Sequence, residues 1–333
     1  MPRLAARLLV AVVAVMALAS PAVALPWPGH YVRGGEVAPP PGPALLVAAG
    51  GVQPAPTQAR AWVAGNPDDP RRPVIAQAIA DVPTAMWLNG AADDAARLGD
   101  LIAAGEGEGR LPVAVMYHIP GRDCGRYSAG GAGGSDAYRK WVDGLVAAIG
   151  DSPVLVVVEP DALAQLDCVP EDLREDRLAL LRHAVSALSA APVAWAYLDA
   201  GHSDWHPPSV MADRLLAAGV ADAHGFTTNV SNHQTTADER AYAAGVDAHL
   251  VEALGTSRAH AIDTGRNGNG SDGEWCNAAG RAIGAGPQVA PEHPDELWLW
   301  IKPPGESDGD CGIGRGTTAG QFVPDIAVEL AAG

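Results

Sequence analysis

An apolar run at residues 154–158 leads directly into Glu159-Pro160-Asp161, which places two carboxylic acids at a turn. Proline restricts the backbone there, so the turn delivers its acids at the end of a predicted strand in a defined geometry. A carboxyl in the position of Asp161 is suited to general acid catalysis. Asp161 could instead cap a helix beginning at Ala162, so this local pattern leaves a catalytic and a structural interpretation open.

Polar residues also follow most of the other predicted strands. They are Tyr117 to Asp123, Asp199, Asn229, Asp263, and Lys302 to Asp308. If the strands are parallel, their carboxyl ends share one face of the fold, which is where barrel enzymes place their chemistry. These residues, distant in sequence, are therefore expected to meet around one cleft.

Short β-rich runs alternate with helical periodicity from about Ala59 onward, which predicts a parallel α/β sheet or barrel. The predicted strands are residues 84–88, 111–119, 153–159, 193–198, 225–229, 259–263 and 297–302, a number near that of a barrel. Between them, Leu178, Leu181, Val185 and Leu188 fall on one helical face. Thr236-Ala237-Asp238-Glu239 has the capping-box spacing that begins a helix.

Three segments are expected along the 333 residues. Residues 1–24 contain Arg3, Arg7, an apolar run and Ala22-Val23-Ala24, the order of a secretory signal peptide cleaved after Ala24. The alternative is an uncleaved membrane anchor, but the apolar run is shorter than the roughly 20 residues of a span. Residues 25–58, rich in Pro, Ala and Gly, predict a flexible or extended lead-in. Residues 59–333 are expected to form one secreted domain that leaves the membrane once the signal is removed.

Charge and cysteine content narrow the function classes. The formal net charge of −17 disfavours nucleic acid as a partner. Four cysteines in an exported chain predict two disulfides; three pairings are possible, and the simplest joins Cys124 to Cys168 and Cys276 to Cys311. No close cysteine pair or paired histidine spacing is present in the sequence, so no metal site is predicted.

Several longer motifs, taken together and in order, resemble glycoside hydrolase family 6. They are Tyr117-His118-Ile119-Pro120-Gly121-Arg122-Asp123-Cys124 with Ser128-Ala129-Gly130-Gly131, then Glu159-Pro160-Asp161, Tyr197-Leu198-Asp199-Ala200-Gly201-His202 with Trp205, Asn229-Val230-Ser231-Asn232, Asp263-Thr264-Gly265-Arg266-Asn267-Gly268, Glu274-Trp275-Cys276-Asn277, and Lys302-Pro303-Pro304-Gly305-Glu306-Ser307-Asp308-Gly309. The resemblance covers about residues 84–330. It implies a distorted parallel (β/α) barrel of about seven strands, two disulfides, inverting hydrolysis of β-1,4-glucan, and no metal or organic cofactor.

The resemblance also implies roles for the carboxylates. Asp161 matches the proton donor to the leaving oxygen, and Asp199 matches the neighbouring carboxyl that helps to keep Asp161 protonated. Asp123 matches a residue that accepts a proton through water, which departs from the simplest inverting scheme. Asp308 matches a second candidate for activating water or for stabilising developing positive charge.

Further residues match the substrate contacts of that family. Tyr117 matches the residue that distorts the sugar ring, and Ser128 matches one that orients the catalytic water. The residues that match sugar-binding positions are Trp87, Trp205, Asn229, Trp275, Lys302 and Glu306. Trp141, Trp195 and Trp298 lie within helix or strand runs and are interpreted as core residues.

The predicted loops favour attack within glucan chains. Asp308-Gly309-Asp310-Cys311 leaves almost no insertion that could roof the site, and only a modest stretch separates Cys124 from Glu159. The expected function is thus that of a monomeric, secreted endo-β-1,4-glucanase acting on soluble or amorphous β-glucan. The alternatives are exo action of the cellobiohydrolase type, another polysaccharide such as chitin or xylan, and a glucan-binding protein without turnover.

Overall fold

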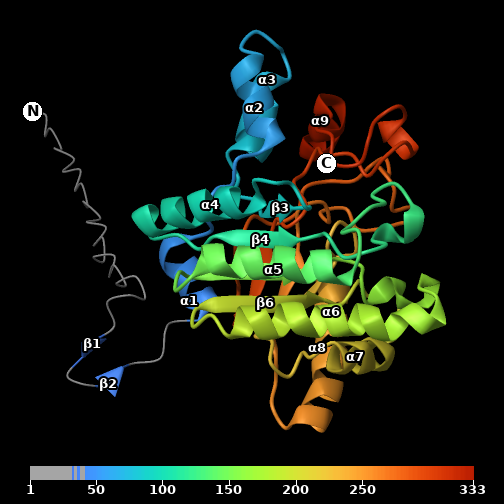
Figure 1. Cartoon of the computed structure of the whole chain (residues 1–333). Coiled ribbons are helices and arrows are strands. Elements are labelled where there is room, and N and C mark those ends of the chain that lie inside the picture. The colour runs from blue at the N-terminus through green and yellow to red at the C-terminus, as the bar shows by residue number, and fades with distance from the viewer. Residues whose placement is uncertain (1–31, 34–35, 38–41) are drawn as a thin grey trace, which may run out of the picture.

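The computed structural model describes residues 32–33, 36–37 and 42–333 (Figure 1). The predicted signal peptide at residues 1–24 and its cleavage site after Ala24 lie outside the described residues. Two short strands, β1 (Val32–Arg33) and β2 (Glu36–Val37), pair antiparallel ahead of the main fold. Within the described residues, no helix is long and apolar enough to span a membrane.

An eight-stranded sheet forms the centre of the fold, with the order β3-β4-β5-β6-β7-β8-β10-β9. Its strands are β3 (Met86–Leu88), β4 (Val113–Met116), β5 (Val154–Val158), β6 (Ala194–Asp199), β7 (Gly225–Thr228), β8 (Ala259–Asp263), β9 (Gln288–Ala290) and β10 (His293–Leu299). All neighbours pair parallel except β9, which pairs antiparallel with β10. The predicted parallel α/β fold is confirmed, with an additional antiparallel edge strand.

The sheet curls so that its first and last parallel strands approach each other. The Ala85 N–H, just before β3, donates to the Trp300 carbonyl just after β10, at 3.0 Å. The Trp87 indole N–H donates to the Ile301 carbonyl at 2.8 Å. These two bonds join β3 and the residue before it to the segment that directly follows β10.

A helix lies between each pair of consecutive parallel strands from β3 to β8, as expected for parallel crossovers, and further helices lie before β3 and after β10 (Figure 1). These helices include α2 (Gln58–Gly65), α3 (Arg72–Ile75), a π-helical turn at Ala76–Ala80, α4 (Asp94–Glu108), α5 (Ser135–Ile149), α6 (Glu171–Ser189), α7 (Pro208–Ala217), α8 (Thr236–Leu254) and α9 (Pro324–Ala332), with 3-10 turns at Asp123–Gly125, Ala164–Cys168 and Gly312–Gly314. In α6, Leu181, Val185 and Leu188 are buried and Leu178 is half-buried, which confirms the predicted helical face. The α8 cap is Thr235, one residue before the predicted Thr236, because the Thr235 hydroxyl accepts the Asp238 N–H.

Both faces of the central strands are buried, so they are apolar almost without interruption. One face packs against the helices through residues such as Met116, Val156 and Leu198. The other fills the inside of the curled sheet with Val115, Val157 and other side chains. Apolar burial on both faces holds the strands in register and fixes where their polar ends emerge.

Helix α1 (Pro43–Gly50) corrects the prediction of a flexible or extended lead-in. Pro43 stands at the first helical position, where its missing N–H costs nothing. Leu46 and Val47 are buried in the interior of the curled sheet, and α1 packs against β9 and β10. The chain then continues through Val52, which bridges to Leu111. From Pro43 onward this segment is therefore part of the fold.

The three tryptophans assigned to the core differ in their burial. Trp195 is buried inside the curled sheet, as predicted. Trp141 and Trp298 are only half-buried, and their indole N–H groups donate to the buried carboxylates of Asp94 and Glu296 respectively. These two side chains combine an apolar contact with a polar one, as indoles commonly do.

Candidate active site

Two adjoining hollows lie at the carboxyl ends of the strands. Their volumes are about 340 Å³ and about 370 Å³, and they share Trp87, Tyr117, Ser128 and Lys302 as lining residues. Because the hollows have this common wall, they form one elongated cleft. The predicted convergence of strand ends around a single cleft is therefore seen in the structure.

Most of the predicted site residues line this cleft. The first hollow holds Trp87, Tyr117, Asp123, Ser128, Asp161, Trp205, Trp275, Lys302 and Asp308, and the second also holds Glu306. Asp199 is buried and does not line the cleft itself. Asn229 is also buried and lies apart from the cleft.

Asp161 and Asp199 form a linked pair of carboxylic acids. Asp161 has a left-handed backbone, with φ of 68°, and its N–H donates to Asp199 Oδ2 at 2.9 Å. The Gly201 N–H and the Thr227 hydroxyl also donate to Asp199, at 3.1 and 3.2 Å. Asp199 is thus held directly behind Asp161 by three hydrogen bonds.

Burial is the largest influence on the pKa values of Asp161 and Asp199. Loss of solvent, followed by the charges of Asp199 and Asp123, raises the pKa of Asp161 well above its usual range. Burial raises the pKa of Asp199 to about 7, although its hydrogen bonds act in the opposite direction. These effects favour the protonated form of Asp161, which is the form that a general acid requires.

The alternative interpretation of Asp161 as a helix cap is wrong. The 3-10 turn at Ala164–Cys168 begins after Leu163 and has no side-chain cap. The Asp161 carboxyl instead lines the cleft, while its backbone N–H is bound to Asp199.

Glu159, in the Glu159-Pro160-Asp161 motif, anchors the neighbouring loop, a role that the sequence pattern alone did not indicate. Its buried carboxyl accepts the His118 and Ile119 N–H groups, both at 2.9 Å. It thereby fixes the segment after Tyr117 to the turn that carries Asp161. Burial raises the pKa of Glu159 to about 7, partly offset by these hydrogen bonds.

Asp123 lies on a tight loop tied to the Asp161 side of the cleft. Asp123 and Cys124 both have positive φ, at 55° and 49°. The Asp123 carboxylate accepts the Ser128 N–H at 2.7 Å and the Gln165 amide at 3.3 Å. The Cys124–Cys168 disulfide joins the loop to the 3-10 turn that contains Gln165.

Tyr117 is held between aromatic and cationic neighbours. Its ring packs edge-on to Trp87 at 5.2 Å between centroids, and the Arg122 guanidinium lies 4.8 Å from its centroid. Burial, followed by the charges of Asp161 and Asp123, raises the pKa of Tyr117 far above its usual range. Tyr117 is therefore a neutral phenol in the wall that the two hollows share.

Asp308 differs from Asp161 because a cation is paired with it. Arg266 Nη1 donates to both Asp308 carboxylate oxygens, at 3.0 and 2.9 Å. Burial acts to raise the pKa of Asp308, but the charges of Arg266 and Lys302 outweigh it and hold the pKa below its usual value. Asp308 is thus an ionised carboxylate. Arg266 was quoted in a sequence motif but was not assigned as its partner.

Indole rings provide flat surfaces along the cleft. Lys302 Nζ lies 5.9 Å from the Trp87 ring centroid, within the range of a cation–π contact. Trp205 packs between His202 and His206, with centroids 5.3 and 6.2 Å away. Trp275 remains 42 % exposed beside Tyr127, whose ring centroid is 6.2 Å away.

Asn229 corrects the prediction of a sugar-binding contact. It is fully buried, and its side-chain amide donates to the carbonyls of Asp263 and Gln234, at 2.8 and 3.2 Å. Its side-chain oxygen accepts the Gln234 N–H at 3.0 Å. With φ of 64°, the chain turns at Asn229 and directs its side chain inward. Asn229 therefore shapes residues 231–234, which line the cleft, instead of lining it directly.

Other cleft residues were not assigned from the sequence. In the first hollow these include Arg126, Gln165, His202, Asp204, Ser231, Asn232, His233, Gln234 and Ser271. His202, Ser231 and Asn232 stood within the quoted motifs, whereas Arg126 and Gln165 carried no local signal of their own. Within the described part of the chain, no three His, Cys, Asp or Glu side chains gather in a group that could hold a metal ion.

Both predicted disulfides are present. Cys124 joins Cys168 and Cys276 joins Cys311, with Cα–Cα separations of 6.3 and 5.9 Å. Each therefore cross-links a loop that carries residues of the cleft, next to Asp123 in one case and close to Asp308 in the other.

The curled parallel α/β sheet, with carboxylates and indole rings around a cleft at its strand ends, defines a barrel enzyme of the glycoside hydrolase class. The model of glycosyl hydrolases family 6 matches residues 50–333. The chain therefore belongs to glycosyl hydrolase family 6, as the motifs indicated.

Similar proteins include bacterial endoglucanases. The chain is 42 % identical over 279 residues to endoglucanase 1 of Streptomyces halstedii, covering 82 % of this chain and 86 % of that protein. It is 43 % identical over 280 residues to endoglucanase 1 of Streptomyces sp. strain KSM-9, covering 82 % and 76 %. Among solved structures, the endoglucanase Cel6 of Mycobacterium tuberculosis, in complex with a methyl cellobiosyl-4-deoxy-4-thio-β-D-cellobioside, matches with a TM-score of 0.77 and 37 % identity, covering 84 % of this chain and 97 % of that one.

Proposed function

We propose that this protein is an inverting endo-β-1,4-glucanase that uses Asp161 as its general acid. The observation that carries the proposal is the position of Asp161, which lines an elongated cleft with indole rings while its N–H is bound to Asp199; burial and the neighbouring carboxylates raise the pKa of its carboxyl. An uncharged polysaccharide fits this site because indole faces pack against sugar rings and carboxyl groups supply acid–base chemistry. Membership of glycosyl hydrolase family 6 and similarity to endoglucanases support the same substrate class.

The reaction is a single displacement at the anomeric carbon. Asp161 donates its proton to the glycosidic oxygen as the bond from that oxygen to the anomeric carbon breaks. Water attacks the opposite face and forms the new carbon–oxygen bond, and a proton from this water passes to a base. The leaving chain gains a hydroxyl, and the new reducing end has the inverted configuration.

Asp123 and Asp308 have different roles in this reaction because their surroundings differ. Asp308 is a weak proton acceptor because Arg266 and Lys302 hold its pKa low. Its fixed negative charge is suited to stabilising the oxocarbenium-like transition state. Asp123 is then the acceptor of the water proton, directly or through another water, with Ser128 beside it on the same loop. Tyr117 presses on the sugar ring from the wall that the two hollows share.

Internal attack is favoured by the short loops around the cleft. The segment from Asp308 to Cys311 is tied to Cys276 by a disulfide and has little length to spare for a roof. The Tyr127 ring lies against the backbone of Gly309. Through this contact the segment from Asp308 to Cys311 touches the loop that carries Asp123. One aromatic contact covers much less of the cleft than the roof of a tunnel would. An open cleft with internal attack is therefore a better interpretation than a tunnel with exo action.

The remaining expectations belong to the same proposal. The mature protein is secreted after removal of residues 1–24 and acts as a monomer without a cofactor. Two disulfides fit an oxidising, extracellular location. The catalytic domain extends N-terminally of the expected boundary at residue 59 and includes α1, because Leu46 and Val47 pack into its interior.

The test is Asp161→Asn, assayed by release of reducing sugar from a soluble β-1,4-glucan. The amide cannot donate the proton but keeps the shape of the site, so we expect kcat to fall by roughly 10²-fold or more with oligosaccharide affinity nearly unchanged. Asp151→Asn, in an exposed turn outside the cleft, is the control and should behave as the parent. Activity of Asp161→Asn near that of the parent would overturn the assignment. A parent chain that binds glucan without hydrolysing it would favour the binding-protein alternative.

A further inference from the structure

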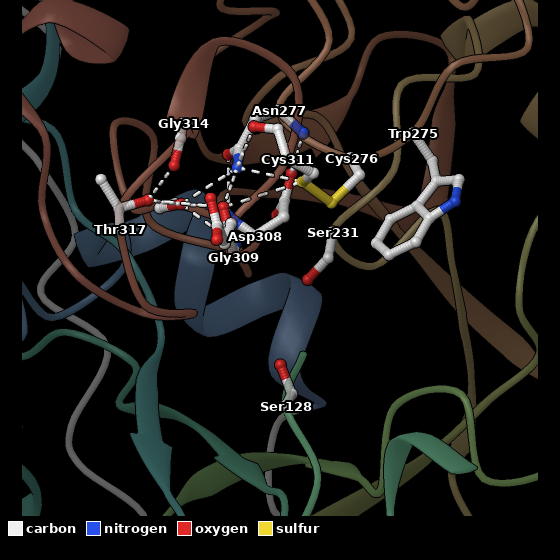
Figure 2. Close-up of a disulfide and its surroundings, with 12 residues drawn as sticks. Ser128, Ser231, Trp275, Cys276, Asn277, Asp308, Gly309, Cys311, Gly314 and Thr317 are labelled. Carbon is white, nitrogen blue, oxygen red and sulfur yellow. Dashed lines mark hydrogen bonds between the residues drawn. A yellow bond between two sulfur atoms is a disulfide. The ribbon is translucent and has the colours of Figure 1, made fainter. Parts of the chain in front are cut away.

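Asn277 is the centre of a hydrogen-bond cluster around Asp308. It directly follows Cys276 and is 3 % exposed. Its side-chain oxygen accepts the Asp308 N–H at 2.8 Å. Its side-chain nitrogen donates to the Ser307 hydroxyl at 3.0 Å and to the Gly309 carbonyl at 2.7 Å. One amide thus binds the backbone on both sides of Asp308 (Figure 2).

The backbone of Asn277 also contacts the Asp308 carboxylate. The Asn277 N–H donates to Asp308 Oδ2 at 2.9 Å, beside the bonds from Arg266. This contact needs φ of 43° at residue 277, in the left-handed region that asparagine and glycine adopt more readily than other residues. Side chain and main chain of Asn277 therefore act on Asp308 together, one on its backbone and one on its carboxylate.

The surrounding loop leaves Asn277 little freedom to move. A side chain at Gly314 would lie 2.3 Å from the Asn277 amide nitrogen, and one at Gly312 would lie 2.2 Å from the Asn277 carbonyl oxygen. The Cys276–Cys311 disulfide joins the two segments at this point, and Figure 2 shows Asn277 lying close to it, with Asp308 and Gly309 alongside. The cluster is thus packed and cross-linked as one unit.

We infer that Asn277 is a positioning residue for catalysis, which sets the place and direction of the Asp308 carboxylate and is itself locked by the Cys276–Cys311 disulfide. The inference rests on the proposed function, because it assumes that Asp308 stabilises charge during hydrolysis. Electrostatic stabilisation depends on a preorganised group, and displacements of about 1 Å can cost about 10²-fold in rate. Trp275 and the other sugar-binding surfaces are separate from the Asn277 side chain, so ground-state binding should be preserved.

The experiment compares Asn277→Gly with Asn269→Gly on cellohexaose. Glycine accepts the positive φ and keeps the N–H to Asp308, so Asn277→Gly removes only the side-chain amide. We expect kcat to fall roughly 10- to 100-fold, while KM and the affinity for an uncleaved thio-linked oligosaccharide change by less than about threefold. Asn269 is exposed on the same loop and its amide donates to the Gly280 carbonyl, so its variant should retain the parent kcat.

Two further measurements separate positioning from folding. Melting curves identify variants that are folded. Ser307→Ala, which removes one of the partners of the Asn277 amide, serves if Asn277→Gly is unfolded. The Ser307 hydroxyl also bonds the Gly309 backbone and the Thr317 hydroxyl, so Ser307→Ala loosens the same cluster from the other side of the Asn277 amide. It should lower kcat by at least about threefold without raising KM. A folded variant with kcat within about twofold of the parent, or one that loses kcat and affinity together, contradicts the inference. An inactive parent chain would instead contradict the proposed function, so the two failures are distinguishable.

Discussion

At the scale of single residues, the environment of each carboxyl decides its chemistry. Asp161 and Asp308 line the same cleft, yet their pKa values are displaced in opposite directions. Desolvation and neighbouring carboxylates raise the pKa of Asp161, whereas the charge of Arg266 helps to lower the pKa of Asp308. This divergence favours a proton on Asp161 and a negative charge on Asp308, which is the combination that the proposed hydrolysis requires.

Asp199→Asn tests the electrostatic link at this scale. The change removes a negative charge that raises the pKa of Asp161, so the pKa of Asp161 should fall. Asp161 then loses its proton at a lower pH, and activity that depends on the protonated form ends sooner as the pH rises. We therefore expect the basic limb of the kcat/KM–pH profile to move to lower pH. A basic limb that stays in place, or moves to higher pH, would contradict the coupling of the two carboxyls.

At the scale of elements, the site lies at the carboxyl ends of the parallel strands. This location could be predicted from the sequence. Asp123, Asp161 and Asp308 follow apolar strands or their extensions, and parallel pairing brings them to one face. Asn229 also follows a strand, but its direction depends on a positive φ and on partners such as Asp263. Such tertiary partners have no signal in the local pattern, which is why the contact was predicted wrongly.

Helix α1 was missed for a related reason. Its proline-rich surroundings suggest extended chain, and few of its residues face the core. Pro43 at the first helical position and Gly51 after its end are recognisable boundary signals. These signals are weak alone, and the helix is explained only by the packing of Leu46 and Val47 inside the sheet.

Strand β9 was also not predicted. It has three residues and, in the described part of the chain, lies at the edge of the sheet beside β10, so it carries too little periodicity to be recognised.

Leu46→Ala and Leu45→Ala form a matched pair that tests whether α1 belongs to the folded domain. Leu46 is 3 % exposed and its neighbour Leu45 is 57 % exposed. Truncating Leu46 should lower the free energy of unfolding by about 2–4 kcal/mol, whereas Leu45→Ala should change it by less than about 0.5 kcal/mol. Urea denaturation of both variants measures the difference. Equal stabilities would return α1 to the status of a loosely attached lead-in.

At the scale of the whole molecule, the cleft determines how a polymer enters. An open cleft admits the interior of a chain, and a few internal cuts shorten a polymer greatly. We expect the viscosity of carboxymethyl cellulose to fall steeply for each reducing end formed. The Tyr127 contact with Gly309 is the feature that could limit lateral entry. Slow loss of viscosity with abundant cellobiose would show that this contact blocks lateral entry of the polymer, and would favour exo action.

The central claim is inverting hydrolysis of a β-1,4-glucan, and the anomeric form of the first product tests it most directly. Proton NMR of cellohexaose digested by the parent chain should show the α-anomer at the new reducing ends before mutarotation mixes the two forms. Attack of water on the face opposite the leaving group, with Asp161 as the acid, can give only that anomer in one displacement. Early appearance of the β-anomer would mean a covalent intermediate, and would contradict both the mechanism and the roles proposed for Asp161, Asp123 and Asp308.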